Sequence, residues 1–395
     1  MISEKMQQLA KNGSAIRAMF EEGKLMAQQY GKENVYDFSL GNPNTPAPEA
    51  IRKAAIDILK ETDPVTLHGY MSNVGYDDVR EKLAASLNQR FGTAFAAKHL
   101  IMTVGAAGAL NVALKTILNP GEEVLLQAPY FGEYNNYISN FDGVPVVAEA
   151  KLPDFGLNLE AMEALISEKT KAVIINSPNN PTGVIYSEEE IKALSDLLRE
   201  KQQQYGHAIY LISDEPYREI VFGNHTVPYL PCFYENTFVG YSYSKSLSLP
   251  GERIGYLAVS PSMEAVEEVI GAAGVANRIL GFVNAPSLFQ KVIGRCTDTV
   301  GDMSLYIRNK EVLYKELTAM GYEMREPEGA FYMFPKALEA DDKAFCAAAK
   351  KHRILIVPGS TFAGPGYFRL AFCVSEATVD HSLEGFAALA KEYGR

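Results

Sequence analysis

A lysine and an arginine stand eight residues apart in a stretch rich in hydroxyl groups, Ser242 to Arg253. The β-rich run 237–241 precedes this stretch, so Lys245 comes just after a strand that we expect to be buried. Burial disfavours the ammonium form, and an uncharged lysine can attack a carbonyl carbon to form a Schiff base. Ser242, Ser244 and Arg253 could hold a phosphate beside it. A Schiff-base lysine next to a phosphate site indicates pyridoxal phosphate, although a solvated lysine in a polar surface loop gives the same pattern.

Three further features also come just after predicted strands. Phe131 follows the strand 123–127, Asn180 follows 171–175, and Asp214 follows 208–212. Because helices alternate with these strands, we expect a mainly parallel sheet, whose ligands bind at the carboxyl ends of the strands. One edge would then offer an aromatic ring, an amide, a carboxylate and an amine. Taken singly, Phe131 could belong to the core, and Asp214 could be an ordinary turn residue.

A turn of small residues, Gly105 to Gly108, separates the predicted strand 99–104 from a helix. The free backbone N–H groups of Ala106 and Ala107 would point at an anion, together with the positive end of the helix dipole. Glycine in such a turn can also serve the chain geometry alone.

Arg369 lies inside the apolar strand 367–372. Arginine is seldom buried without a partner, so we expect an anion beside it. That anion is either an internal acid, which would make a structural ion pair, or a substrate carboxylate held by the two-pronged guanidinium.

The composition is that of an ordinary globular protein of 395 residues, 47% hydrophobic and 22% charged. A net charge of -11 argues against nucleic acid or an anionic membrane as the main partner. The four cysteines have no paired or metal-binding spacing, which indicates a reducing compartment and no metal site. We find no signal peptide and no apolar run of about 20 residues, so we expect a cytoplasmic protein.

The rest of the pattern indicates two domains. An amphipathic helix is expected over 14–30 with Ser14 as its N-cap, and a capping box at Ser187 and Glu190 opens another helix. From about residue 286 the chain alternates helices with short strand-like pieces at 322–324, 330–334, 354–359 and 367–372. We therefore expect an α/β fold with a large domain over 46–285, and a smaller α+β domain made of 1–45 and 286–395.

Together these residues resemble the class I and II aminotransferases, pyridoxal-phosphate enzymes of fold type I. The resemblance covers about residues 14 to 390. It lies in four motifs that follow the family's order: Asn180-Pro181-Thr182-Gly183, Asp214-x-x-Tyr217, Ser242-x-Ser244-Lys245 with Arg253, and Phe368-Arg369. It implies a seven-stranded sheet between helices, and the transfer of an amino group from an L-amino acid to a 2-oxo acid by ping-pong chemistry.

The resemblance also implies a role for each residue. Lys245 forms the aldimine with the cofactor and then acts as acid and base, and Asp214 keeps the pyridine nitrogen protonated. Tyr217 and Asn180 bind the phenolic oxygen, and Phe131 stacks on the ring. Two groups of residues would hold the anions: Ala106, Ala107, Ser242, Ser244 and Arg253 the phosphate, and Arg369, Asn180 and the backbone of Gly41 the substrate α-carboxylate.

Two features concern the partner subunit and the substrate. Tyr70 matches the tyrosine that reaches the phosphate of the neighbouring subunit, which implies a homodimer with shared active sites. Where one branch of the family has a lysine that reads a second carboxylate, this chain has Ala107. Arg278, ahead of Asn284-Ala285-Pro286, is the candidate for that contact by analogy with another branch. The resemblance leaves the amino donor open.

Two other functions are compatible with the motifs. A carbon–sulfur β-lyase uses the same lysine, aspartate and arginine, but its turnover needs no 2-oxo acid. A regulatory domain of a transcription factor can share this fold without catalysis. The acidic charge and the lack of a DNA-binding extension argue against that second alternative.

Overall fold

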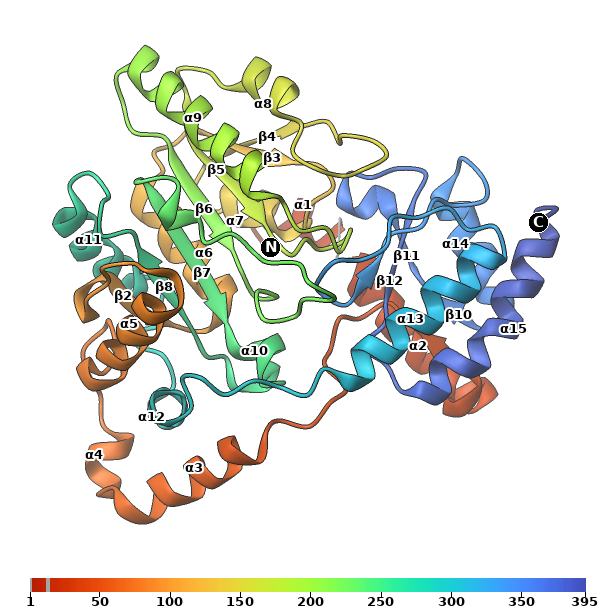
Figure 1. The fold of residues 1–395 in the computed structure, drawn as a ribbon, viewed down its shortest axis with the longest axis horizontal. Helices are drawn as coiled ribbons and strands as arrows, with labels where there is room; N and C mark the ends of the chain where they lie inside the picture. The colour runs from red at the N-terminus through yellow and green to blue at the C-terminus, as the bar shows by residue number, and fades with distance from the viewer. Residues whose placement is uncertain (1, 12–14) are drawn as a thin grey trace.

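The structure, a computed structural model, describes residues 2–11 and 15–395. Figure 1 shows a sheet flanked by helices on the left and a smaller lobe on the right, which contains α13 (Ser304–Ala319), α14 (Asp342–Lys351) and α15 (Glu376–Glu392). Below the sheet in this view lie α3 (Glu49–Glu61) and α4 (Pro64–His68). None of the described helices combines the length and the apolar character needed to cross a membrane.

The large lobe is built on a seven-stranded sheet with the order β2-β8-β7-β6-β5-β3-β4. The five strands from β7 to β4 in this order run parallel, and β8 is antiparallel to both of its neighbours. The predicted α/β fold with a mainly parallel sheet is confirmed. The strands are β2 (Leu100–Thr103), β3 (Glu123–Gln127), β4 (Val144–Ala148), β5 (Thr170–Asn176), β6 (Tyr210–Asp214), β7 (Thr237–Ser242) and β8 (Gly255–Val259).

Helices cover both faces of this sheet. Successive residues of a strand point to opposite sides, and here the apolar side chains on both sides are buried against helices. On β3, Val124 and Leu126 share a core with α6 (Gly105–Ile117), α7 (Glu133–Ser139) and α11 (Val266–Ile279). Between them, Leu125 points to the other face, where α8 (Leu159–Leu165) and α9 (Glu188–Tyr205) pack. At the β2–β8 end, residues of that second face share a core with α5 (Asp77–Phe91) and α12 (Ser287–Arg295), and α3 packs against α12.

The small lobe holds two short sheets. β1 (Tyr36–Asp37) pairs in parallel with β10 (Ile354–Leu355), and β12 (Phe368–Ala371) lies between β11 (Val357–Pro358) and β9 (Tyr332–Met333). The chain segment ahead of the large lobe thus contributes β1 to this lobe, whereas farther upstream Lys5 donates to the Ser139 carbonyl of the large lobe at 2.6 Å. The predicted strand at 322–324 is absent, since the segment after Gly321 pairs with no strand.

The domain boundaries stay a prediction. Residues Val292 and Ile293 of α12 lie in the same hydrophobic core as α3 and α5 of the large lobe. We therefore propose that the second boundary lies between α12 and α13 rather than at residue 286.

Local signals account for several helix ends. Ser187 and Glu190 form the predicted capping box of α9, which ends at Gly206 in the left-handed conformation. The predicted N-terminal helix is α2 (Ala15–Tyr30), preceded by α1 (Glu4–Lys11), and the expected N-cap Ser14 lies outside the described residues. The segment between β7 and β8 contains only α10 (Tyr243–Ser246) and one 3-10 turn. Because it lacks a crossover helix, β8 must return antiparallel.

Candidate active site

A cavity of about 730 Å³ lies at the carboxyl ends of the parallel strands, where the two lobes meet. Most of the residues that the sequence predicts for the site line it. They are Gly41, Ala106, Ala107, Phe131, Asn180, Asp214, Tyr217, Ser242, Ser244, Lys245, Arg253 and Arg369. The four residues expected to meet at one edge of the sheet, Phe131, Asn180, Asp214 and Lys245, all line this cavity. Tyr70 and Arg278 do not line it.

Lys245 projects from α10, directly after β7 and the N-cap Ser242. Its Nζ donates a hydrogen bond to the carbonyl of Gly41 at 2.6 Å. Burial lowers the pKa of Lys245 to about 8, and the nearby charges of Arg369 and Arg253 act in the same direction. At pH 7 roughly a tenth of this amine is therefore uncharged, far more than for an ordinary lysine, and the uncharged form is the one that attacks a carbonyl carbon.

Asp214 ends β6 at the bottom of the cavity and is 6% exposed. Tyr134 donates to its Oδ2 at 2.5 Å, and its Oδ1 is buried without a partner. Burial raises the pKa of Asp214 to about 7, against the lowering effect of the Tyr134 hydrogen bond. An unpartnered carboxylate oxygen in an apolar setting is suited to a cationic N–H donor.

A set of donors suited to a phosphate lies at the N-terminus of α6. Ser242 Oγ donates to Ser244 Oγ at 2.8 Å, and Arg253 Nη2 donates to the Val104 carbonyl at 3.1 Å. A Cβ on Gly105 would lie 3.0 Å from Arg253 Nη2, and this glycine has φ +81°. The bare backbone therefore lets the guanidinium approach the first turn of α6, whose N–H groups are free for an anion.

Arg369 is 2% exposed on β12. Its Nη1 donates to Asn180 Oδ1 at 3.0 Å, its Nη2 donates to the Ser39 carbonyl at 2.5 Å, and its Nε has no partner. None of these groups is a carboxylate, so the internal ion pair that the sequence left open is not formed. A buried guanidinium without a counter-ion beside a cavity is a binding site for an anion.

Two aromatic side chains complete the walls. The Tyr217 hydroxyl lies 2.8 Å from that of Tyr332 on β9. Phe131 is half-buried and meets Tyr134 edge-on, with ring centroids 5.7 Å apart. Phe131 lies in the cavity wall and contacts Tyr134, which in turn binds Asp214. This position fits a ring that stacks on a flat ligand.

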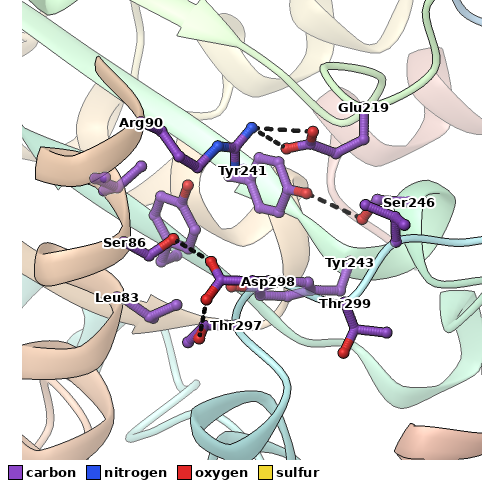
Figure 2. Close-up of a pocket in the computed structure, with 13 residues that line it drawn as sticks. Leu83, Ser86, Arg90, Glu219, Tyr241, Tyr243, Ser246, Thr297, Asp298 and Thr299 are labelled. Atoms are coloured by element: carbon purple, nitrogen blue, oxygen red, sulfur yellow. Dashed lines mark hydrogen bonds and ion pairs between the residues drawn. The ribbon is translucent and has the colours of Figure 1, made fainter. Parts of the chain in front are cut away.

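A second cavity, of about 270 Å³, lies between α5, the strands β7 and β8, and the loop 297–300 (Figure 2). Its polar groups bind one another: Arg90 pairs with Glu219 at 2.7 Å, and Ser86 donates to Asp298 at 2.9 Å. Of the buried polar atoms without a partner in the described part of the chain, none belongs to its lining, whereas Asp214 Oδ1 and Arg369 Nε belong to the larger cavity. The larger cavity is therefore the better candidate for a binding site, because a ligand could bind its unpartnered polar atoms.

Comparison with known proteins agrees with this geometry. The sequence model of the family "Aminotransferase class I and II" matches residues 33–386. The chain belongs to this family. A probable aspartate/prephenate aminotransferase of Aquifex aeolicus is 32% identical over 371 residues, 91% of each chain.

Solved structures of aminotransferases share the fold over nearly the whole chain. An aminotransferase from Eubacterium rectale superposes with a TM-score of 0.98, is 45% identical, and is covered completely, as is this chain. Aspartate aminotransferase from Thermus thermophilus, solved with maleate, has a TM-score of 0.87 and 26% identity over 98% of this chain and 99% of its own.

The aminotransferase depends on pyridoxal phosphate, and its residues fit that cofactor. The unpartnered Asp214 Oδ1 suits the pyridinium N–H, the α6 N-terminus with Ser242, Ser244 and Arg253 suits the phosphate, and Lys245 suits the aldehyde. When bound, pyridoxal phosphate carries the amino group and accepts the electrons of the broken Cα–H bond. Among the described residues, no cluster of histidine, cysteine or acidic side chains could hold a metal ion.

Three contacts within the site were not predicted. Tyr134 binds Asp214, Tyr332 binds Tyr217, and Asn176 Nδ2 donates to the Asp214 carbonyl at 2.8 Å. The available signal was chemical, since a buried phenol or amide needs a hydrogen-bond partner. The partner itself comes from a distant part of the sequence, so no local pattern identifies it.

Proposed function

We propose that Lys245, Asp214 and Arg369 carry the transamination of an α-amino acid and a 2-oxo acid in this cavity. The observation that supports it most is Arg369, a buried guanidinium without a carboxylate partner in the same cavity as Lys245. Both substrates of a transaminase carry an α-carboxylate, so one arginine can serve both half-reactions. Asn180 orients the guanidinium through the contact of its Oδ1 with Nη1.

The roles of the other residues follow from their chemistry. Lys245 Nζ takes the proton from the substrate α-carbon and returns it to the cofactor, because its pKa of about 8 lets it act as base and acid. Asp214 holds the ring nitrogen protonated, and the Tyr217 hydroxyl donates to the phenolic oxygen. Ala106, Ala107, Ser242, Ser244 and Arg253 bind the phosphate, and Phe131 covers the ring.

We also propose a homodimer with shared sites. Tyr70 is 92% exposed, and its loop is tied to the end of α11 by Asn277 Nδ2, which donates to the Asn73 carbonyl at 2.7 Å. Exposed Val65 lies on α4, just ahead of this loop, and exposed Val275 and Ile279 lie on α11 with Arg278. The two predicted residues that miss the cavity of their own subunit, Tyr70 and Arg278, thus lie on one face that a second copy could cover. Arg278 then remains the candidate for a distal carboxylate, and the cytoplasm is the proposed location.

Borohydride reduction followed by peptide mass spectrometry tests the assignment of Lys245. The purified protein should lose its visible absorbance on reduction and carry the cofactor mass on the peptide with Lys245. Label on another lysine would contradict the assignment. Turnover of amino acids should also require a 2-oxo acid, and turnover without one would favour the carbon–sulfur lyase instead.

A further inference from the structure

Tyr332 touches three parts of the site at once. It is 2% exposed on β9, and its hydroxyl lies 2.8 Å from the Tyr217 hydroxyl. Arg369 lies over its ring, with the guanidinium carbon 4.6 Å from the centroid. A Cβ on Gly41 would lie only 2.0 Å from the Tyr332 hydroxyl, so the backbone that accepts from Lys245 presses directly against it.

The direction of the Tyr217–Tyr332 hydrogen bond follows from proton counting. A phenol has one proton to donate. If Tyr217 donates its proton to the phenolic oxygen of the cofactor, the proton between the two tyrosines must come from Tyr332. Burial raises the pKa of Tyr332 to about 12, so this residue keeps its proton over the working pH range.

We propose that Tyr332 is a positioning residue for transamination: its hydroxyl aims Tyr217 at the cofactor, while its ring supports Arg369. The inference rests on the proposed function, in which Tyr217 and Arg369 contact the cofactor and the substrate. A hydrogen bond donated to the phenolic oxygen stabilises its negative charge after the Lys245–cofactor nitrogen loses its proton. Loss of the Tyr332 hydroxyl weakens this bond and so favours the protonated nitrogen.

The test is a pH titration of the visible spectrum of the holoenzyme, without substrate. Tyr332→Phe keeps the ring under Arg369 but removes the hydroxyl. It should raise the midpoint (the pH at which half of the Lys245–cofactor nitrogen is protonated) by about 0.4 to 1 unit, which corresponds to one net hydrogen bond. Tyr217→Phe should raise it further, and adding Tyr332→Phe to that variant should change nothing more. Tyr322→Phe is the matched control, since Tyr322 is also buried in the small lobe and its hydroxyl donates to the Phe386 carbonyl at 3.1 Å; its midpoint should equal that of the wild type.

The inference would be overturned if Tyr332→Phe had the same midpoint as the wild type. It would also be overturned if adding Tyr332→Phe to Tyr217→Phe raised the midpoint as much as Tyr332→Phe does alone. If the wild-type protein shows no visible absorbance band, or if reduction does not attach the cofactor to Lys245, the proposed function itself is refuted, and the inference with it. The two failures are therefore distinguished before any variant is compared.

Discussion

Two groups of opposite charge, the buried Asp214 and the half-buried Lys245, line one cavity without forming an ion pair with each other. Burial moves the pKa of Asp214 up to about 7 and that of Lys245 down to about 8. Burial therefore shifts both groups toward their uncharged forms, so that each of them titrates close to neutral pH. This arrangement costs folding stability at a site built for binding.

Ionisation of the buried Asp214 carboxyl destabilises the folded state. We therefore expect Asp214→Asn to stabilise the cofactor-free protein, by an amount that depends on pH. The folded carboxyl has a pKa of about 7 and the unfolded one 3.8, so the folded state loses stability as pH rises from 3.8 to 7. Above pH 7 the loss is complete and amounts to at most about 4 kcal/mol. Urea unfolding should therefore show a more stable variant at pH 8 and a smaller gain at pH 5.

Asp154→Asn is the control for that experiment, because Asp154 is exposed, and its effect should be small at both pH values. A gain for Asp214→Asn that is equal at pH 5 and pH 8 would contradict the explanation. In the holoenzyme the same substitution should nearly abolish turnover, since the ring nitrogen loses its anionic partner.

Arg369→Lys tests the carboxylate site. The substitution keeps the charge but loses the fork that binds two carboxylate oxygens. We expect kcat/KM to fall by about 30- to 4,000-fold for every amino acid, which corresponds to the roughly 2–5 kcal/mol that such buried pairs lose on truncation. Arg278→Ala should instead affect only aspartate and glutamate. The measurement is kcat/KM of each variant with a set of amino-acid donors. If Arg278→Ala affected every donor and Arg369→Lys affected only aspartate and glutamate, the roles of the two arginines would have to be exchanged.

At the scale of elements, the segment after β6 is held by a buried ion pair. Arg218 Nε donates to Glu215, and the side chains are 4% and 1% exposed. The same guanidinium donates to the carbonyls of Val227 and Pro228, at 3.0 and 2.9 Å. One arginine thereby fixes a distant loop against the strand end that carries Asp214.

Arg218→Met should destabilise the protein by about 3–5 kcal/mol, because it leaves the Glu215 carboxylate buried and unpaired. Arg199→Met breaks the comparable but exposed pair with Glu235 and should cost less than about 1 kcal/mol. Urea unfolding of both variants measures the difference. Similar losses in the two would mean that Glu215 is protonated or hydrated in the folded state.

The sequence predicts those elements whose pattern is local. Buried strands with a polar residue after each one, such as β6 before Asp214, indicate a parallel sheet and its binding edge. Two strands were not predicted as they stand: β8 runs antiparallel between β7 and β2, and β4 pairs with β3 at the edge of the sheet, where Val144 and Val147 are exposed and the buried pattern of a central strand is missing. Residues within local motifs could be proposed for the site from the sequence. Tyr134 and Tyr332 could not, because their contacts with Asp214 and Tyr217 join distant parts of the sequence.

At the scale of the whole molecule, the proposed dimer makes a quantitative prediction. A Tyr70-deficient subunit and a Lys245-deficient subunit should both be poorly active alone. In a mixed dimer, one of the two sites combines an intact Lys245 with an intact Tyr70 from the partner. Statistical reassembly after mild denaturation should restore about a quarter of the wild-type activity, because half of the dimers are mixed.

The control is the Lys245-deficient protein reassembled with itself, which should stay inactive. Analytical ultracentrifugation checks the assembly at the same time. A fully active monomer, or an inactive mixture that contains the mixed dimer, would contradict sharing of the sites.

The contact between Gly41 and Tyr332 also restricts how this chain can change during evolution. A Cβ at residue 41 would lie 2.0 Å from the Tyr332 hydroxyl and still only 2.8 Å from the ring carbon that bears it. Even Tyr332→Phe would leave too little room, so residue 41 can change only after residue 332 has become smaller than phenylalanine. Among homologous sequences we therefore expect any residue other than glycine at position 41 to occur with a small side chain at position 332. A common pairing of alanine at 41 with tyrosine at 332 would show that the backbone there moves apart more easily than the structure indicates.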